Sequence, residues 1–402
     1  MVMINKPRLV IIPGVGKNSE SLATRVKEIL ENDFELGPDV EVFSPEKEVK
    51  GREPDPRNPF IQGYFSDDDP KAEAGKLTLQ RAVDNNYVAM VRYMDDPESP
   101  FGKNDDLMHL WALGDLLNNA NPSRRVLAIP YTPFLRSHSN RKYDEKGVAK
   151  AYTMGMFLQV LKHTGIDRLI TIEPHARTEL KQIAGREFGI DTTFFSPFDD
   201  PRALDYLKLG ALRKNMKLIE KLGAFKMKIE NEFPDAYFIA VDDGAEKTCE
   251  DMIYKVGTTF ENTKYEKILA FLKIRTGEGH SKIIGLKSWC NPDFEKLKGG
   301  TAVILDDMVS SGRSANDIAQ YSKENYGVAR AILLAANPVC PDPDKVRLEH
   351  IDETHTLGTV PHKSIKGINI ERDVHPYMLA AGLFKSYSGH IDRMERDMNR
   401  IG

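Results

Sequence analysis

The chain has 402 residues, which is too many for one ordinary hydrophobic core, so we expect two domains. Its content of 41% hydrophobic and 29% charged residues is typical of a soluble globular protein. The formal net charge of −4 gives no reason to expect binding to nucleic acid or to an anionic membrane. Any positive charge that a phosphate-bearing ligand requires must therefore be concentrated locally.

Three scattered cysteines, Cys249, Cys290 and Cys340, form neither a CxxC pair nor a disulfide framework. This pattern favours a reducing compartment, and we expect a cytoplasmic protein. The first apolar run, Leu9 to Pro13, is too short for a signal peptide or a membrane span and predicts a strand instead.

Short apolar runs alternate with amphipathic helical patterns along the chain, which predicts an α/β fold with parallel sheets and helices on both faces. Two proline-rich stretches, 44–62 and 338–350, are predicted to be loops or insertions. The predicted strands cover residues 9–12, 87–93, 126–130, 169–172, 237–241, 302–305 and 329–335, and the predicted helices cover 19–32, 105–119, 148–163, 213–230 and 314–325.

Residues Gly14 to Ser19 resemble part of a Walker A phosphate loop. The spacing of that motif is missing, because no glycine stands five residues before Gly16 and Lys17 is followed by Asn18. A helix N-cap at Ser19 explains the stretch better than a nucleotide site.

The most informative stretch is residues 301–314, TAVILDDMVSSGRS. A buried strand ends in Asp306 and Asp307, a loop of small hydroxyl residues follows, and a helix starts near Ser314. Free N–H groups at a helix N-terminus bind anions, and carboxylates bind Mg²⁺ or sugar hydroxyls. The combination suits a sugar phosphate, although the aspartates could merely end the strand, with the serines as N-caps.

Three other predicted strands are followed by polar groups that could bind a nucleotide or its metal ion. The first is followed by Arg136 and His138, the second by Glu173 and His175, and the third by Asp242. Ligands of α/β proteins bind at this end of the strands. The Arg136 loop alone is better explained as a solvated basic loop, and a lone histidine at a strand end is more often structural. Acidic or metal-capable groups nevertheless follow three strands, at 169–172, 237–241 and 302–305, which favours one Mg²⁺–nucleotide site.

Residues 271–280 combine Lys273 and Arg275 with two glycines. A mobile basic loop of this kind would neutralise phosphate charge during phosphoryl transfer. Without context, an exposed loop with ordinary surface charges explains the stretch equally well.

The 301–314 stretch resembles the phosphoribosyl-diphosphate-binding signature that type I phosphoribosyltransferases and ribose-phosphate diphosphokinases share. The ordered motifs upstream resemble the ribose-phosphate diphosphokinase (phosphoribosyl-diphosphate synthetase) family over roughly residues 9–335. They are the first strand-to-helix turn at 16–23, the Phe-x-Asp-Gly-Glu segment at 63–69, the Asn-Asp-x-Leu-Met and Ile-Pro-Tyr landmarks at 104–108 and 129–131, the ATP loop at 136–142, Glu-Pro-His at 173–175 in place of Asp-Leu-His, the diphosphate loop at 242–245 and the flexible catalytic loop at 273–275.

The chain departs from the family pattern at several positions. Ser137 stands where the family has glutamine, Arg313 stands where it has a loop glycine, and serines replace the loop threonines. The chain is also longer, with additions near 44–62 and between 190 and 236. These changes leave the paired aspartates and the Lys/Arg loop in place.

The resemblance implies two doubly wound parallel-sheet domains of the type I phosphoribosyltransferase-like fold. The first would span 1–185, carry the ATP loop and be completed by a C-terminal helix at 376–402. The second, 186–375, would carry the ribose 5-phosphate loop, the diphosphate loop and the flexible catalytic loop. The implied roles are catalysis by Lys273 and Arg275, ATP binding by Phe65, Asp67, Asp69, Arg136, Ser137 and His138, ribose 5-phosphate binding by Asp306, Asp307, Ser310, Ser311, Gly312, Arg313 and Ser314, and metal binding by His175 and Asp242.

The implied reaction converts ATP and ribose 5-phosphate into 5-phosphoribosyl 1-diphosphate and AMP, with Mg²⁺ as cofactor. The implied assembly is a homodimer or larger homo-oligomer, in which residues 65–69 complete the adenine pocket of a neighbouring subunit. No nucleic acid or membrane partner is expected. The alternatives are a non-catalytic regulatory relative of the synthetase and a type I phosphoribosyltransferase that consumes phosphoribosyl diphosphate.

Overall fold

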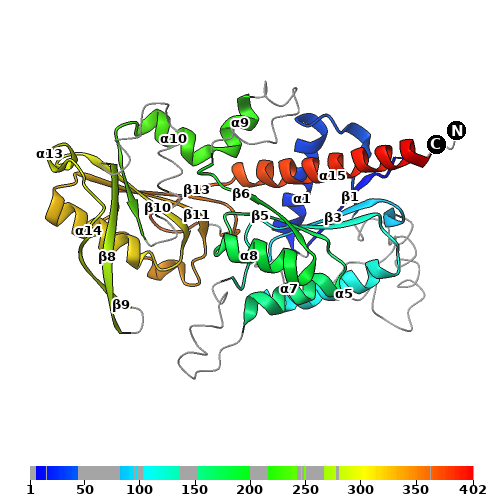
Figure 1. The fold of residues 1–402 in the computed structure, drawn as a ribbon, viewed down its shortest axis with the longest axis horizontal. Helices are drawn as coiled ribbons and strands as arrows, with labels where there is room; N and C mark the ends of the chain where they lie inside the picture. Colours follow the sequence, from blue (N-terminus) through cyan, green and yellow to red (C-terminus); the bar gives the residue numbers. More distant parts are fainter. Residues whose placement is uncertain are drawn as a thin grey trace. The chain divides into compact units, whose positions relative to one another are not determined.

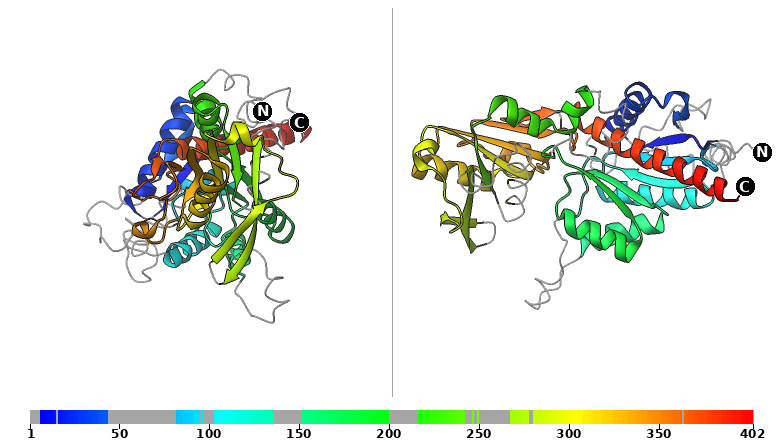
Figure 2. Two further views of the ribbon diagram at one scale, coloured as in Figure 1. Left: turned by 90° about the vertical axis from the view of Figure 1, so that its left-hand side faces the viewer. Right: turned by 45° about the horizontal axis from the view of Figure 1, so that its top comes forward.

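The computed structural model describes residues 6–14, 16–43, 82–94, 96, 103–135, 152–199, 216–241, 246, 249, 267–277, 280–362 and 364–401. By its internal packing the chain divides into two compact units. The first unit consists of Met1–Phe194 and Pro376–Gly402, and the second consists of Phe195–His375. Figures 1 and 2 show the helices and strands of each unit.

The first unit is built on a six-stranded sheet in the order β2-β1-β3-β4-β5-β6. Adjacent strands from β2 through β5 pair in parallel. Its central strands are continuous apolar runs, because helices cover both faces of a parallel sheet. The strands are β1 (Leu9–Pro13), β2 (Val40–Val42), β3 (Tyr87–Val91), β4 (Arg124–Ala128), β5 (Arg168–Ile172) and β6 (Asp191–Phe195).

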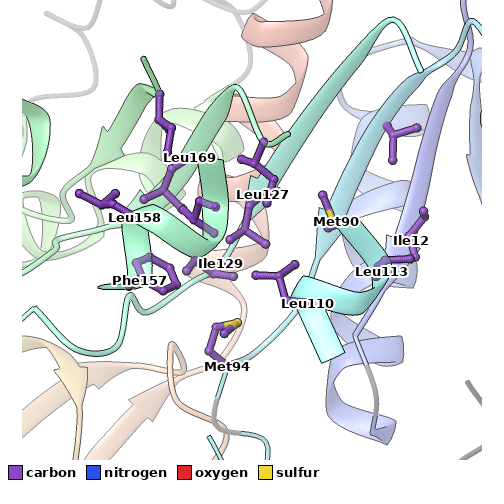
Figure 3. Close-up of a cluster of buried hydrophobic side chains, with 14 of the residues drawn as sticks. Ile12, Met90, Met94, Leu110, Leu113, Leu127, Ile129, Phe157, Leu158 and Leu169 are labelled. Carbon is purple, nitrogen blue, oxygen red and sulfur yellow. The ribbon is translucent and has the colours of Figure 1, made fainter. Parts of the chain in front are cut away.

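Helices α1 and α15 lie on one face of this sheet, and α5 and α7 lie on the other (Figures 1 and 2). On the α5/α7 face, aliphatic and aromatic side chains of the strands and the helices form one buried cluster (Figure 3). The helices are α1 (Lys17–Asn32), α5 (Lys103–Asn118), α7 (Thr153–His163), α8 (Arg177–Ile183) with the helical turn Ala184–Phe188, and α15 (Val374–Ile401). The cluster includes Ile12, Met90, Leu127, Ile129 and Leu169 from the sheet side and Leu110, Leu113, Phe157 and Leu158 from the helices.

The C-terminal helix α15 packs against the first sheet. The Tyr387 hydroxyl donates to the carbonyl oxygen of Pro7 at 2.7 Å, just before β1. The rings of Phe34 and Phe384 lie 4.8 Å apart between their centroids. These contacts join the two ends of the chain within one unit.

The second unit is built on a seven-stranded sheet in the order β13-β12-β11-β10-β7-β8-β9. Its strands pair in parallel, except that β8 and β9 are antiparallel. Residues of α14 pack against side chains of the central strands in a second buried cluster. The elements are β7 (Tyr237–Ala240), β8 (Ile268–Gly277), β9 (His280–Leu286), β10 (Thr301–Val309), β11 (Arg330–Pro338), β12 (Glu353–Leu357), β13 (Asn369–Glu371), α9 (Met216–Leu222), α10 (Ala224–Glu232), α13 (Phe294–Leu297) and α14 (Arg313–Tyr326).

The structure confirms the predicted α/β fold of two largely parallel sheets, and it changes two of the expected elements. The strand expected at 302–305 continues to Val309 as β10, because its partner β11 continues alongside it through Pro338. Residues 271–277, expected to be a loop, are part of β8, because they pair with β9.

A buried polar cluster lies where β1 and β3 end in the first unit. Arg92 and Asp106 are 1% and 0% exposed, and they form an ion pair at 3.0 Å. Arg92 also lies 3.3 Å from Nδ1 of His109, whose pKa is lowered to about 3 by burial and by the Arg92 charge. His109 therefore stays neutral over the physiological range, and the charge of Arg92 is balanced by carboxylates.

The start of α1 differs from the sequence prediction. Helix α1 begins at Lys17 with Gly16 as its N-cap, so the expected N-cap at Ser19 is wrong. The backbone N–H and the hydroxyl of Ser19 donate to the Asp96 carboxylate at 3.0 and 3.2 Å. Asp96 therefore occupies the position at this helix N-terminus where an anionic ligand would bind.

The Arg92–Asp106 pair yields a stability prediction. Asp106→Asn should lower the free energy of unfolding by about 3 kcal/mol, because it leaves the buried Arg92 guanidinium without its ion-pair partner. Glu28→Gln, which breaks the exposed Arg25–Glu28 pair in the same unit, should cost far less. Urea titrations of both variants measure the difference, and equal losses would contradict the assigned role of burial.

Candidate functional site

The described part of the candidate site lies at the end of β10 in the second unit. Asp306 and Asp307 lie near the carboxyl end of this strand, and both are half-buried. Consecutive strand residues point to opposite faces of a sheet, so the two carboxylates leave β10 on different sides. The Asn337 amide of the neighbouring β11 donates to the carbonyl oxygen of Asp307 at 2.9 Å, which ties the two strand ends together.

A tight turn joins β10 to α14. Gly312 is the N-cap of α14 and has the left-handed angles φ 72° and ψ −10°. Gly312 has no side chain to cap the helix, and among the described residues no side chain accepts a hydrogen bond from the amides of its first turn. Ser311 and Ser314 are exposed, and Arg313, the first residue of the helix, is half-buried. Amides and a cation at one helix N-terminus suit an anion.

A second segment, which no sequence motif marks as functional, packs against this turn. The Arg347 backbone N–H donates to the carbonyl oxygen of Ser311 at 2.9 Å. The His350 backbone N–H donates to Oδ1 of Asn316 at 2.8 Å. Residues 338–350 were predicted as a plain proline-rich loop, and no motif in them signals this contact.

His175 lies in the first unit, after β5, and is half-buried. On either side of it in the sequence, the non-glycine residues Glu173 and Ala176 have positive φ angles of 39° and 56°. Such strained backbone clusters at functional sites, which fits the expected role of this edge of the sheet. His175 thus follows the carboxyl end of β5, which lies between β4 and β6 in the sheet.

Lys273 and Arg275 lie in the second unit on β8. Their backbones pair with those of Ile283 and Ser281 on β9. They therefore belong to an antiparallel pair of strands at the edge of the sheet that also contains β10.

The other predicted site residues are outside the described ranges. The structure describes the turn that contains the predicted ribose 5-phosphate residues. It does not describe the predicted nucleotide site or the His175–Asp242 pair. Within the described ranges, no group of three or more His, Cys, Asp or Glu side chains is placed to hold a metal ion. No helix there is long and apolar enough to cross a membrane. The undescribed site residues are Phe65, Asp67, Asp69, Arg136, Ser137, His138 and Asp242.

Comparison with known proteins finds relatives of one kind. The chain is 25% identical over 265 residues to a ribose-phosphate pyrophosphokinase of Burkholderia pseudomallei, covering 64% of this chain and 67% of that protein. It is 19% identical over 304 residues to a ribose-phosphate pyrophosphokinase of Saccharolobus solfataricus, covering 74% and 86%. The crystal structure of phosphoribosylpyrophosphate synthetase from Mycobacterium smegmatis matches with a TM-score of 0.59 at 16% identity, covering 96% of this chain and 99% of that chain. No family model matches.

The chain is thus similar to ribose-phosphate pyrophosphokinases at 19–25% identity, a similarity that supports a divergent relationship to these proteins. Its two sheets have the phosphoribosyltransferase-like fold of the matched synthetase, as the sequence predicted. The family glycine that Arg313 replaces is therefore not needed to form this turn, because the left-handed position is taken by Gly312.

The geometry of Gly312 yields a second prediction. A Cβ at this position would lie 2.5 Å from the Arg347 carbonyl oxygen, and the left-handed φ would add strain. Gly312→Ala should therefore lower the free energy of unfolding by about 3 kcal/mol.

Gly299→Ala is the matched control for this experiment. Gly299 also has a left-handed φ, 78°, but no atom lies within 4 Å of its added Cβ. It should cost only about 1 kcal/mol, the penalty for the backbone conformation alone. Similar losses in urea titrations of the two variants would show that the Arg347 segment does not press on the turn.

Proposed function

We propose that the protein transfers the diphosphoryl group of MgATP to the C1 hydroxyl of ribose 5-phosphate. The products are 5-phosphoribosyl 1-diphosphate and AMP. The observation that carries the proposal is the end of β10, where two carboxylates, a tight turn and the uncapped N-terminus of α14 follow one another. The name of the relatives, ribose-phosphate pyrophosphokinase, supports the same reaction.

In the proposed reaction, the turn from Ser310 to Ser314 binds the 5-phosphate through its backbone amides and the α14 dipole. Asp306 and Asp307 accept hydrogen bonds from ribose hydroxyls. The C1 oxygen attacks the β-phosphorus of ATP in line, the bond between that phosphorus and the bridging oxygen of AMP breaks, and the hydroxyl proton is lost. Positioning and charge stabilisation provide most of the rate enhancement in such a transfer.

The carboxylates of Asp306 and Asp307 are hard oxygen donors, which is the chemistry that Mg²⁺ selects. They would hold Mg²⁺ beside the sugar. His175 and Asp242 would hold the Mg²⁺ that is bound to ATP. The bound ion would neutralise charge on the phosphates. Arg136, Ser137 and His138 would contact the nucleotide.

The direct test is an incubation with ATP, Mg²⁺ and ribose 5-phosphate, followed by measurement of AMP and 5-phosphoribosyl 1-diphosphate. Equal amounts of the two products are expected. Failure to form AMP would reject the proposed reaction, and release of inorganic diphosphate with a nucleobase as co-substrate would instead identify a phosphoribosyltransferase.

Lys273 and Arg275 are proposed to stabilise charge that develops on the transferred group. Changing either residue to Ala should lower kcat by about 10²-fold, with a smaller effect on KM, because it removes a transition-state donor. Lys296→Ala, which removes an exposed lysine of the same unit paired with Asp293, is the control and should leave kcat unchanged. Normal kcat in both Ala variants would show that these two cations take no part in the chemistry.

We propose the adenine pocket to be shared between two copies of the chain, with Phe65, Asp67 and Asp69 contributed by the neighbour. Phe65 offers a flat apolar face for the base, and the carboxylates can accept from its exocyclic amine. Mixing an inactive Phe65→Ala/Asp67→Ala variant with an inactive Lys273→Ala variant should then restore activity, because one mixed site would be intact. Full activity from a strictly monomeric species in sedimentation would refute the shared pocket.

A further inference from the structure

The segment that follows β11 reaches the same edge of the sheet as the turn after β10. The two strands pair in parallel through Asp306↔Ala335 and Val309↔Pro338, so their carboxyl ends lie side by side. The chain beyond β11 therefore emerges next to the proposed 5-phosphate turn, at the edge where ligands of α/β sheets bind.

This segment is fixed to the turn on both sides of Gly312. On one side, the Arg347 N–H donates to the carbonyl oxygen of Ser311 at 2.9 Å. On the other, Asn316, which is 7% exposed, accepts from the His350 N–H at 2.8 Å. The Arg347 carbonyl comes so close to Gly312 that only a glycine fits there. The backbone of Arg347 is thus held against the residue that precedes α14.

Arg347 differs in its ion pairing from two lysines of the same unit. Lys345 is paired with Asp342 at 2.6 Å, and Lys323 is paired with Asp352 at 2.7 Å. The Arg347 side chain is exposed, and it forms no ion pair with any residue in the described ranges. A cation without a carboxylate partner among the described residues therefore extends from a backbone that contacts the turn.

The charge balance of the turn gives this guanidinium a role. A sugar phosphate would bring a dianion next to the carboxylates of Asp306 and Asp307, while the whole chain has a net charge of −4. Favourable binding then requires cations close to the phosphate. Arginine suits this task, because its planar group can donate two parallel hydrogen bonds to phosphate oxygens.

We propose that Arg347 is a second cation of the ribose 5-phosphate site, where it binds the 5-phosphate together with the α14 amides and Arg313. The inference rests on the proposed function, because it takes the substrate of that reaction as the ligand. It adds a specificity-determining residue outside the 301–314 stretch. Arg347 thereby favours phosphorylated sugars over the corresponding free sugars.

The test is calorimetric titration of the full chain with ribose 5-phosphate in the presence of Mg²⁺ and the absence of ATP. Arg347→Ala should weaken binding by about 10-fold, the effect of losing charge-assisted hydrogen bonds from an exposed cation. The affinity of Arg347→Lys for ribose 5-phosphate should lie between those of the unaltered chain and Arg347→Ala, because lysine keeps the charge and loses the paired donors. In steady-state assays, KM for ribose 5-phosphate should rise in Arg347→Ala while KM for ATP stays unchanged.

Lys345→Ala is the matched control, because it removes an exposed cation from the same segment that already has a carboxylate partner. It should bind ribose 5-phosphate as the unaltered chain does, and thermal melts should show all variants folded. Equal affinities of Arg347→Ala and Lys345→Ala would overturn the assignment of Arg347, and so would a failure of the unaltered chain to bind ribose 5-phosphate. Binding that responds to Arg347→Ala without formation of AMP would keep the assignment and reject the proposed reaction alone.

Discussion

Parallel pairing of β10 with β11 is the constraint on which the described part of the candidate site depends. The pairing extends β10 through Asp306 and Asp307, although aspartate by itself disfavours a strand. It also sets the ends of both strands at one edge of the sheet. The turn that follows β10 and the segment that follows β11 therefore meet, and the contacts of Gly312 with Arg347 fix how they meet.

Two helix N-termini in this protein have similar backbone geometry but differ in whether a carboxylate of the protein accepts hydrogen bonds from the first turn. Both α1 and α14 start after the end of a parallel strand, at a glycine N-cap with a positive φ. At α1, the Asp96 carboxylate accepts from the first turn, so the anion position is filled by the protein itself. At α14 no side chain of the described residues accepts from the first turn. The difference in the acceptor, rather than in the backbone, separates a structural turn from a proposed binding site.

The buried cluster around Arg92 and the turn after β10 also differ in how exposed their charged groups are. In the first unit, Arg92 is fully buried and is balanced by carboxylates, while burial keeps its neighbour His109 neutral. Such a closed set of charges stabilises the fold only while all members are present. At the turn after β10, the carboxylates are half-buried and Arg347 is exposed. Groups that remain accessible to water can exchange it for a ligand.

Local patterns in the sequence determined the α/β fold, because buried parallel strands are continuous apolar runs and their helices are amphipathic. They also predicted an anion-binding turn within residues 301–314, since the carboxylates, small residues and helix start are contiguous there. Contacts between distant residues were decided only by the tertiary structure. Ser19 was predicted as an N-cap, but its acceptor Asp96 lies 77 residues away. Residues 271–277 were expected to be a loop, and pairing with β9 makes them a strand. Arg347 carries no local signal, because it reaches the turn only through the parallel register of β10 and β11.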